Sequence, residues 1–301
     1  MSAQAPTVSV VIPSYKRAHL LEQTLPTYLQ DHVIELILVD DCSPDNTPEV
    51  MARLMAADSR IRYLRQDRNQ GQMAAKNRGK AEARGDFVYF GDDDSVLLPG
   101  AIGALLETLR QHPGSVAGAA SVYMNHNETS AVAAAARRRK VQTPLEVVDL
   151  RHLRFRFDCV ADRLLEIAVC PNCFMVETSQ ARKQDFDSVY KGNAYREETD
   201  FLLRVRAQGA PMILDTRAVQ VNLPARMSTG GSRKGFWRTE YYVMANSLLM
   251  LKRNRQILRE LAPGFSGATA MTSLLGERIG GVIRRNRQRG RKLWRMLSAR
   301  A

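Results

Sequence analysis

The stretch Gly85-Asp-Phe-Val-Tyr-Phe-Gly-Asp-Asp-Asp-Ser-Val-Leu-Leu-Pro99 decides the fold class of this chain. Residues 87–90 form a short apolar run of β-prone side chains, which predicts a buried strand. Three carboxylates follow (Asp92, Asp93 and Asp94), and Pro99-Gly100 then opens a helix. Carboxylates just past a strand lie where open α/β sheets bind ligands. Because three adjacent carboxylates repel one another, the pattern favours a divalent metal. A solvated acidic turn that caps the helix is the alternative.

Strand and helix patterns alternate on both sides of this stretch. Strands are expected at residues 7–12, 35–39, 61–64 and 87–90, and helices at about 18–29, 48–57 and 73–83. Such alternation predicts βαβ units on a mostly parallel sheet with right-handed connections. The polar segments after the strands should therefore meet at one edge of the sheet. These segments are residues 14–17, 40–41, 69–71 and 92–94.

Composition limits the class of protein. The 301 residues are 45% hydrophobic and 25% charged, which is typical of a globular protein that buries a substantial core. A net charge of +13 favours anionic partners such as nucleotide phosphates, nucleic acid or an anionic lipid surface. Four cysteines without a small-scaffold spacing indicate a reducing compartment, and Cys170 and Cys173 lack a second pair for zinc. Neither a signal peptide nor a transmembrane helix is expected.

Four segments together resemble a known family. They are Val10-Val-Ile-Pro-Ser-Tyr-Lys-Arg17, Leu38-Val-Asp-Asp-Cys-Ser-Pro-Asp-Asn-Thr47, Asn69-Gln-Gly71 with Lys76-Asn77, and the Gly85 stretch. In order and spacing they are similar to the family 2 glycosyltransferases, over about residues 7–115. The resemblance implies a GT-A fold, which is an α/β fold with a Rossmann-like, mostly parallel sheet flanked by helices. A helical C-terminal extension is expected in addition.

The resemblance also implies roles for single residues. Asp41 would contact the nucleoside, Asp92 the ribose or sugar, and Asp94, with Asp92, the divalent metal (Mn²⁺ or Mg²⁺) through the D-x-D motif. Lys76 stands where the family more often has Arg. The full set of implied nucleotide-sugar contacts is Pro13, Ser14, Tyr15, Arg17, Asp41, Asn69, Gly71, Lys76, Asp92, Asp93 and Arg233.

A second motif, residues 195–209, supplies candidates for the catalytic base. The spacing of its apolar residues predicts a helix with Glu197, Glu198 and Asp200 at its amino end. The helix dipole alone explains acidic residues there. The resemblance implies in addition that the second acid of the pair is the base, which is Glu198 in place of the usual Asp. Asp200 is the alternative.

Two further segments bear on the site. Asn222 stands where the family often has a His that completes the metal site, which predicts a weaker metal site. Residues 229–233 resemble a flexible Gly-Gly loop near the diphosphate, with Arg233 as a charge for the leaving group. The Ala-rich residues 126–143 are expected to form a surface excursion.

The expected organisation is a nucleotide-sugar-binding half (1–115), an acceptor-binding and catalytic half of the same domain (116–235), and a helical extension (236–301). Residues 277–301 carry nine Lys or Arg together with apolar side chains, including Trp294 and Leu297. This composition suits a helix on an anionic membrane surface, and a solvated tail is an equal alternative.

The resemblance implies that the protein moves a sugar, with inversion, from a nucleoside-diphosphate sugar to an acceptor hydroxyl. The donor would be of the UDP or dTDP type, and the acceptor a saccharide or a lipid-linked molecule, in cell-surface polysaccharide or glycoconjugate synthesis. A cytoplasmic location, peripheral at the inner membrane face, is expected, and a nucleic-acid partner is not. The alternatives are a sugar-phosphate nucleotidyltransferase and a non-catalytic module that binds an anionic polymer or nucleic acid.

Overall fold

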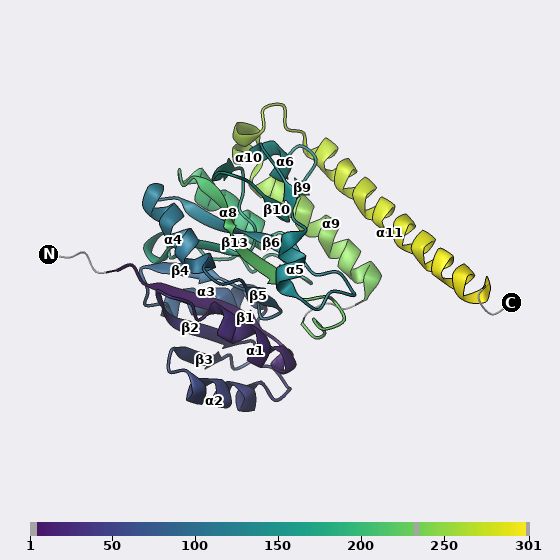
Figure 1. Cartoon of the computed structure of the whole chain (residues 1–301). Coiled ribbons are helices and arrows are strands. Elements are labelled where there is room, and N and C mark those ends of the chain that lie inside the picture. The colour runs from purple at the N-terminus through teal and green to yellow at the C-terminus, as the bar shows by residue number, and fades with distance from the viewer. Residues whose placement is uncertain (1–4, 232–234, 299–301) are drawn as a thin grey trace.

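One large twisted sheet connects the first and second parts of the chain (Figure 1). The computed structural model describes residues 5–231 and 235–298, with side chains described through Ile283. In this part of the chain the large sheet has nine strands. Eight of them follow the order β11-β13-β6-β12-β4-β1-β2-β3, and the ninth, β5, pairs with β13. Their bounds are β1 (Val8–Ser14), β2 (Val33–Asp40), β3 (Ile61–Arg65), β4 (Phe87–Phe90), β5 (Ser95–Leu97), β6 (Val116–Tyr123), β11 (Leu165–Ile167), β12 (Phe174–Glu177) and β13 (Met212–Asn222).

The large sheet is mostly parallel in strand direction and mixed in pairing, with four parallel and four antiparallel strand pairs among the described residues. Strands β1, β2, β3 and β4 pair in parallel, as do β6 and β13. Strand β12 lies antiparallel between β4 and β6 and so joins the two halves of the chain in one sheet. Because the parallel strands β1, β2 and β4 end at the same edge, the segments that follow them meet there.

Helices cover both faces of the sheet (Figure 1). Their bounds are α1 (Ala18–Thr24), α2 (Thr47–Ala57), α3 (Gln72–Glu82), α4 (Ala101–Gln111), α5 (Ala131–Ala136), α6 (Pro144–Val147), α7 (Thr178–Ala181), α8 (Glu197–Ala207), α9 (Phe236–Arg253), α10 (Arg255–Leu261) and α11 (Gly267–Ser298). Alternate residues of each strand face opposite ways. Thus Val11 packs in a core with α3, α8 and α9, whereas its neighbours Val10 and Ile12 pack in a core with α1, α2 and α4.

Four phenylalanines fix α8 on the sheet. The Phe201 ring of α8 stacks on Phe186 with centroids 4.1 Å apart, and it also contacts Phe90 of β4 and Phe174 of β12. All four side chains are buried. Each aromatic pair adds about 0.5–1.5 kcal/mol beyond the burial of its area. The amino end of α8 is therefore held rigidly beside the end of β4.

Two helices end earlier than the sequence pattern predicts. The helix expected at 18–29 stops at Thr24 and continues as a 3₁₀ turn, η1 (Leu25–Tyr28), because the ring of Pro26 cannot continue an α-helix. Within the expected helical extension (236–301), the first helix ends before Asn254, which separates α9 from α10. There the Asn254 side chain donates to the carboxylate of Asp200 (2.7 Å) and to the carbonyl of Met250 (3.0 Å).

The segment after β6 is more ordered than an irregular excursion. It contains α5 and β7 (Arg139–Lys140), which pairs with β10 (Cys159–Val160). Strands β8 (Val148–Asp149) and β9 (Arg154–Phe155) form another small sheet.

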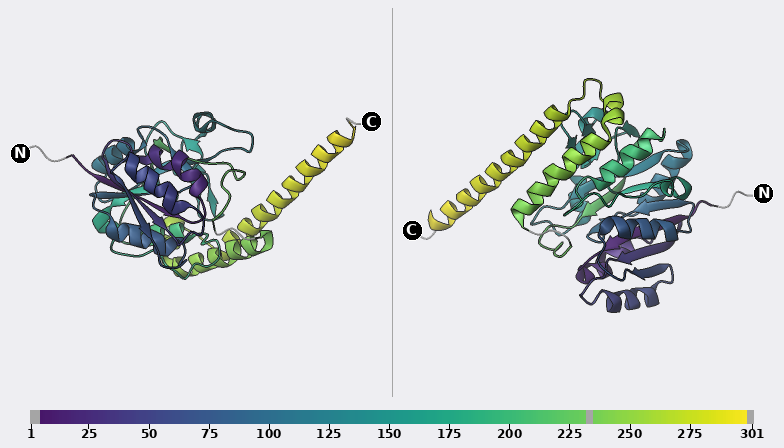
Figure 2. Two further views of the ribbon diagram at one scale, coloured as in Figure 1. Left: turned by 90° about the horizontal axis from the view of Figure 1, so that it is seen from below. Right: turned by 180° about the vertical axis from the view of Figure 1, so that it is seen from behind.

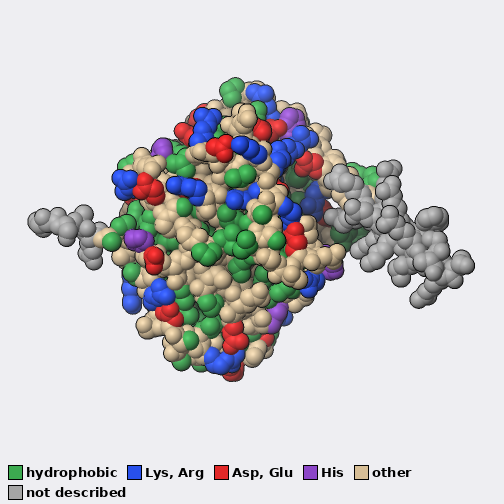
Figure 3. Space-filling model, viewed as in Figure 1, with side chains coloured by type: hydrophobic (Ala, Val, Ile, Leu, Met, Phe, Trp, Pro, Cys, Tyr) green, Lys and Arg blue, Asp and Glu red, His purple; other side chains and the backbone are tan. Residues whose placement is uncertain are grey.

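The last helix, α11, begins on the body of the protein and then projects away from it (Figure 2). Ala270 and Leu274 are buried, and Arg278 donates to Glu240 of α9 through Nε (2.7 Å). Within the described part of the chain, no helix is both long and apolar enough to cross a membrane. On the face in Figure 3, described Lys and Arg side chains are interspersed with Asp and Glu and form no continuous basic stripe.

Candidate functional site

A cleft of about 710 Å³ lies at the edge where β1, β2 and β4 end. This volume suits a small-molecule or cofactor site. Its walls come from both halves of the chain, including the segments after β1, β4, β9 and β13 and the start of α8. Nine residues expected at the site line it: Pro13, Ser14, Tyr15, Arg17, Asp41, Asp92, Asp93, Asp94 and Glu198.

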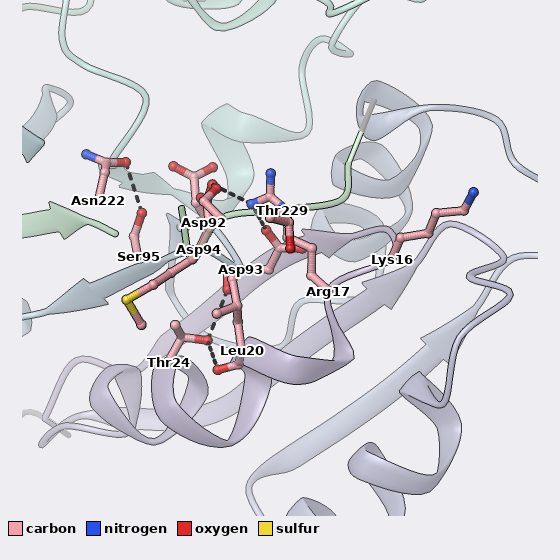
Figure 4. Close-up of polar contacts among 12 residues, drawn as sticks. Lys16, Arg17, Leu20, Thr24, Asp92, Asp93, Asp94, Ser95, Asn222 and Thr229 are labelled. Atoms are coloured by element: carbon pink, nitrogen blue, oxygen red, sulfur yellow. Dashed lines mark hydrogen bonds and ion pairs between the residues drawn. The ribbon is translucent and has the colours of Figure 1, made fainter. Parts of the chain in front are cut away.

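Two of the three carboxylates after β4, Asp93 and Asp94, share Arg17 as a partner (Figure 4). Asp92 accepts hydrogen bonds from the side-chain amides of Asn172 (2.6 Å) and Gln220 (3.1 Å). Arg17 donates to Asp93 (2.9 Å) and also pairs with Asp94, which in turn accepts from the Ser228 hydroxyl. The neighbouring Lys16 side chain points away from the triplet (Figure 4).

The triplet carries more negative charge than its surroundings neutralise. Burial, reinforced by Asp94, raises the pKa of Asp92 to about 7. Burial also raises the pKa of Asp93 to about 6, although the Arg17 guanidinium opposes the increase. One guanidinium therefore compensates the three carboxylates only in part, which is the electrostatic setting of a site that takes up a cation.

The metal site itself is less complete than the triplet suggests. Among residues 5–231 and 235–283, no three His, Cys, Asp or Glu side chains are grouped to hold a metal ion. Asn222, at the position of the family's His, accepts from Ser95 (2.9 Å) and donates to Ser121 (3.1 Å) and to the carbonyl of Val122. These bonds occupy its amide. The donor set nevertheless fits a magnesium-type ion, which is commonly held by one or two carboxylates together with substrate phosphates.

Asp41 organises the loop that follows β3. Its carboxylate accepts from the backbone N–H groups of Gln70 (2.7 Å) and Gly71 (2.8 Å) and from the Gln66 amide (2.6 Å). Gly71 has a φ of +89°, a conformation that favours glycine. Asn69 donates to the carbonyl of Asp41 (3.3 Å). Asp41 lines the cleft, whereas Asn69 and Gly71 lie behind it as its hydrogen-bond partners.

The two glutamates that begin α8 differ in exposure and in charge. The Glu198 side chain is 20% exposed and lines the cleft, whereas Glu197 is fully buried. Lys76 donates to both, at 2.7 Å to Glu197 and 2.5 Å to Glu198. Burial and the adjacent Glu198 raise the pKa of Glu197 well above its usual range. Burial acts in the same direction on Glu198, but Lys76 and the hydrogen bond with Glu197 outweigh it and lower its pKa.

The pKa values of the two carboxyl groups shift in opposite directions. The pKa of Glu197 is the one that is raised, because that carboxyl is more deeply buried and burial penalises the charged form. Glu197 Oε2 has no hydrogen-bond acceptor or donor among the described residues other than this neighbouring carboxylate. Glu198 is therefore ionised and faces the cleft, which is the state required of a general base.

Asp200 occupies a different environment. Its carboxylate is fully buried and accepts from Arg204 (2.8 Å) and Asn254 (2.7 Å), with Arg253 at 3.4 Å. It does not line the cleft. These contacts join α8 to α9 and α10, so they account for Asp200 without a catalytic role.

Lys76 also lies elsewhere than a phosphate contact would require. Its side chain is 2% exposed, its ammonium is bonded to two carboxylates, and it sits 5.1 Å from the centre of the Phe186 ring. The position of its Cα on the buried face of α3 explains this difference from the expected contact. Arg233 falls outside the described residues.

The start of the Gly-Gly loop packs directly on the segment after β1. Gly230 has a φ of +92°, and a Cβ atom there would lie 2.1 Å from the carbonyl oxygen of Lys16. Gly231 donates to the carbonyl of Tyr15 (3.1 Å) and lines the cleft. Only glycine permits such a close approach.

Several cleft residues carry no signal that would single them out in the sequence. Asn172 lies between two cysteines, Ser228 belongs to no pattern, and Arg196 lies in the 195–209 motif without a role assigned to it. They reach the cleft because β12, β13 and α8 bring distant parts of the chain to the end of β4. A charged residue directly before an acidic pair, as at Arg196, is the one hint that the sequence offers.

Solved structures of known fold resemble this architecture. The S. aureus TarS 1-349 structure in complex with UDP-GlcNAc has a TM-score of 0.58 at 16% identity, and covers 85% of this chain and 71% of that chain. The complex of the same fragment with UDP gives a TM-score of 0.57 over 85% and 70% of the two chains. At this identity the likeness establishes the fold, which is the GT-A fold.

The sequence comparisons then give the family. The sequence model described as glycosyl transferase family 2 matches residues 9–175, more than half of the chain. This chain belongs to that family, and the assignment displaces the nucleotidyltransferase alternative.

Two curated relatives illustrate the similarity. One is GalNAc(5)-diNAcBac-PP-undecaprenol beta-1,3-glucosyltransferase of Campylobacter jejuni, 39% identical over 105 residues, which are 34% of each chain. Another is the putative teichuronic acid biosynthesis glycosyltransferase TuaG of Bacillus subtilis, 36% identical over 96 residues, which are 31% of this chain and 38% of TuaG. The matched part spans about a third of the length of these relatives.

Proposed function

We propose that this protein transfers a sugar, with inversion, from a UDP-type sugar to an acceptor hydroxyl, with dTDP-sugars as the second donor class. One observation carries the proposal: a carboxylate triplet and the lysine-paired carboxylate of Glu198, from a distant helix, line the same cleft. TarS, which shares the fold, has been solved with UDP and with UDP-GlcNAc, and this supports a uridine donor.

Donor binding would use the ends of β1, β2 and β4. Asp41 lines the cleft, where a base or ribose would contact it, and Arg17, once released from Asp94, can face the phosphates. Asp94, with Asp92 nearby, would hold Mn²⁺ or Mg²⁺ against the diphosphate. When bound, such an ion neutralises charge that develops on the leaving diphosphate. The residues from the two halves of the cleft would align donor and acceptor for displacement.

Glu198 would act as the base. The acceptor hydroxyl gives its proton to the Glu198 carboxylate as its oxygen attacks the anomeric carbon. The bond from that carbon to the diphosphate oxygen breaks, and the nucleoside diphosphate leaves with the bonding electrons. Attack from the face opposite the leaving group inverts the anomeric centre. The extra methylene of Glu relative to Asp extends the carboxylate from the amino end of α8 into the cleft.

Lys76 would then be a positioning residue for Glu198. Lys76→Met removes the ammonium that keeps the pKa of Glu198 low, so burial is expected to raise that pKa. Because activity needs the ionised base and falls as pH drops through its pKa, the acid limb of the kcat profile should move to higher pH by about one unit or more. Lys76→Arg keeps the charge and should retain the wild-type limb. Thermal unfolding is used to verify that both proteins are folded. Identical pH profiles for Lys76→Met and the wild type would then contradict this role.

The relatives suggest where such a transfer takes place. One acts on an undecaprenol-diphosphate-linked saccharide by its name, and another belongs to teichuronic acid biosynthesis. On this basis we place the protein in cell-surface polysaccharide or glycoconjugate synthesis, at the cytoplasmic face of the membrane. The acceptor would be a saccharide, free or lipid-linked.

A thermal-shift panel tests the donor assignment. UDP, dTDP, GDP, ADP and CDP, and the corresponding sugars, are compared with and without Mn²⁺. A ligand at 100 times its Kd adds about 2.7 kcal/mol to the free energy of unfolding, so a true donor is readily detected. Stabilisation by UDP or dTDP that increases with Mn²⁺ is expected. A panel in which no nucleotide shifts the unfolding temperature would reject the function.

The exposed face of α11 favours membrane contact. Leu275, Ile279 and Ile283 repeat every four residues on this helix and are 46%, 51% and 49% exposed. Beyond Ile283 the sequence contains eight Lys or Arg and no Asp or Glu. The side chains of Trp294 and Leu297 lie outside those described. Basic and apolar residues on one helix match an anionic lipid surface.

Removal of residues 284–301 tests this contact. This truncation spares Ala270, Leu274 and Arg278, which pack on the body of the protein. Each basic residue near an anionic surface contributes about 1 kcal/mol, so the truncated protein should no longer sediment with anionic liposomes at low salt. UDP binding should be unchanged. Full-length protein that ignores anionic liposomes would contradict the proposal.

A further inference from the structure

Arg196 presents a buried positive charge in the cleft wall that has no hydrogen-bond or ion-pair partner among the described residues. The residue precedes α8, has a φ of +74°, is 8% exposed and lines the cleft. Its guanidinium makes no hydrogen bond or ion pair with the side chains and backbone that the structure describes, and its Nε is fully buried without a hydrogen-bond partner. The undescribed stretches contain no Asp or Glu that could serve instead. An arginine stays protonated in proteins, so this guanidinium is charged without a direct ion pair among the described residues.

The surroundings hold the guanidinium without using its N–H groups. It lies 4.3 Å from the centre of the Phe155 ring and 4.6 Å from that of Tyr195. Ring faces attract the cation but leave the planar edge with its donors free. Burial lowers the pKa of Arg196, and the nearby Glu277 is itself bonded to Arg154 at 2.7 Å. The cost of an unpaired buried charge therefore remains to be offset by a ligand.

The left-handed backbone at Arg196 is a conformation that is often found at functional sites. A non-glycine residue with positive φ is uncommon and is strained for a long side chain. Arg196 directly precedes Glu197 and Glu198, and in this conformation its side chain lies against the rings of Phe155 and Tyr195.

We propose that Arg196 forms an oxyanion-binding subsite for the acceptor, so that the protein selects an acceptor with a phosphate or carboxylate close to the hydroxyl that is glycosylated. A planar guanidinium with free N–H groups suits bidentate contact with either group. The aromatic rings beside it offer a surface for a sugar ring. This inference rests on the proposed function, since it assigns the donor to the end of the cleft formed by the carboxylate triplet.

Calorimetric titration separates the ligand classes. Protein saturated with UDP and Mn²⁺ is titrated with inorganic phosphate, with glucuronate and, as the neutral reference, with glucose. Binding of phosphate alone indicates a phosphorylated or lipid-diphosphate acceptor, and binding of glucuronate alone indicates a uronic acid acceptor. Binding of both supports the shared oxyanion chemistry. Equal weak responses to all three would overturn the proposal.

Two variants assign the binding to Arg196. Arg196→Gln should lower the affinity for the anion by about 10- to 100-fold, because the charged hydrogen bonds at this subsite are lost. The affinity for UDP should be unchanged. Arg137→Gln is the matched control, since Arg137 also lines the cleft but already pairs with Glu128 at 2.6 Å. Arg196→Lys keeps the charge and should retain part of the affinity. Thermal unfolding confirms that each variant is folded.

These binding measurements distinguish failure of the Arg196 subsite from failure of the proposed function. Loss of anion binding in Arg137→Gln but not in Arg196→Gln would overturn the subsite. Weaker UDP binding in Arg196→Gln would place the arginine at the donor and also overturn it. If UDP does not bind the wild type, the donor assignment fails, and the comparison of phosphate binding between wild type and Arg196→Gln still decides the subsite.

Discussion

Replacement of Glu198 by Gln is expected to lower kcat by about 10²–10⁴, the usual contribution of a general base. The amide keeps the shape of the side chain but cannot accept the acceptor's proton. Donor binding should change little, because the nucleotide contacts lie at the ends of β1, β2 and β4. Measurement of kcat and of the Kd for UDP on the same preparation checks both parts.

Asp200→Asn provides the comparison for this variant. Asp200 belongs to a buried ion-pair network with Arg204 and Arg253, so its loss should lower the free energy of unfolding, with kcat per folded molecule nearly unchanged. If Asp200→Asn loses turnover and Glu198→Gln retains it, the base has been assigned to the wrong carboxylate.

Asp94→Ala is expected to abolish transfer and the Mn²⁺-dependent part of UDP binding. Asp94 is the carboxylate that pairs with Arg17 and Ser228 in the cleft, and no other described side chain at the end of β4 can take over its charge at the same point. The effect is measured as transfer rate and as the ratio of UDP affinities with and without Mn²⁺.

Asp86→Ala is the matched control at the opposite end of β4. Its carboxylate is exposed and accepts hydrogen bonds from Thr7 (2.9 and 2.8 Å), far along the strand from the cleft. It should leave transfer intact. Undiminished activity of Asp94→Ala in Mn²⁺ buffer would reject the D-x-D assignment.

The parallel part of the fold could be predicted because its signals are local. Each of β1, β2 and β4 is a mainly apolar run bounded by turn or cap residues, β3 is a shorter run of β-prone residues, and the structure has strands at all four places. The breaks at Pro26 and Asn254 were missed for different reasons. The helical spacing of apolar residues continues past Pro26, so the end of the helix there is not evident from the spacing. The break at Asn254 depends on a contact with Asp200, 54 residues away.

The site was predictable to the extent that it follows strand ends. The residues after β1, β2 and β4 do line one cleft, as the rule for parallel sheets requires. The surroundings of Lys76 could not be read from the sequence, because its carboxylate partners lie more than 120 residues away, on α8. The unpaired charge of Arg196 is likewise a property of packing and leaves no sequence pattern. The division at residues 115 and 235 stays a prediction.

A crystal structure with UDP and Mn²⁺, with the metal located by its anomalous signal, tests the central claim most directly. The account predicts Mn²⁺ in contact with Asp94 and the diphosphate, the uridine beside Asp41, and Glu198 open to the remaining part of the cleft. UDP bound outside this cleft, or Mn²⁺ bound away from the triplet while Asp94 keeps its pair with Arg17, would contradict it.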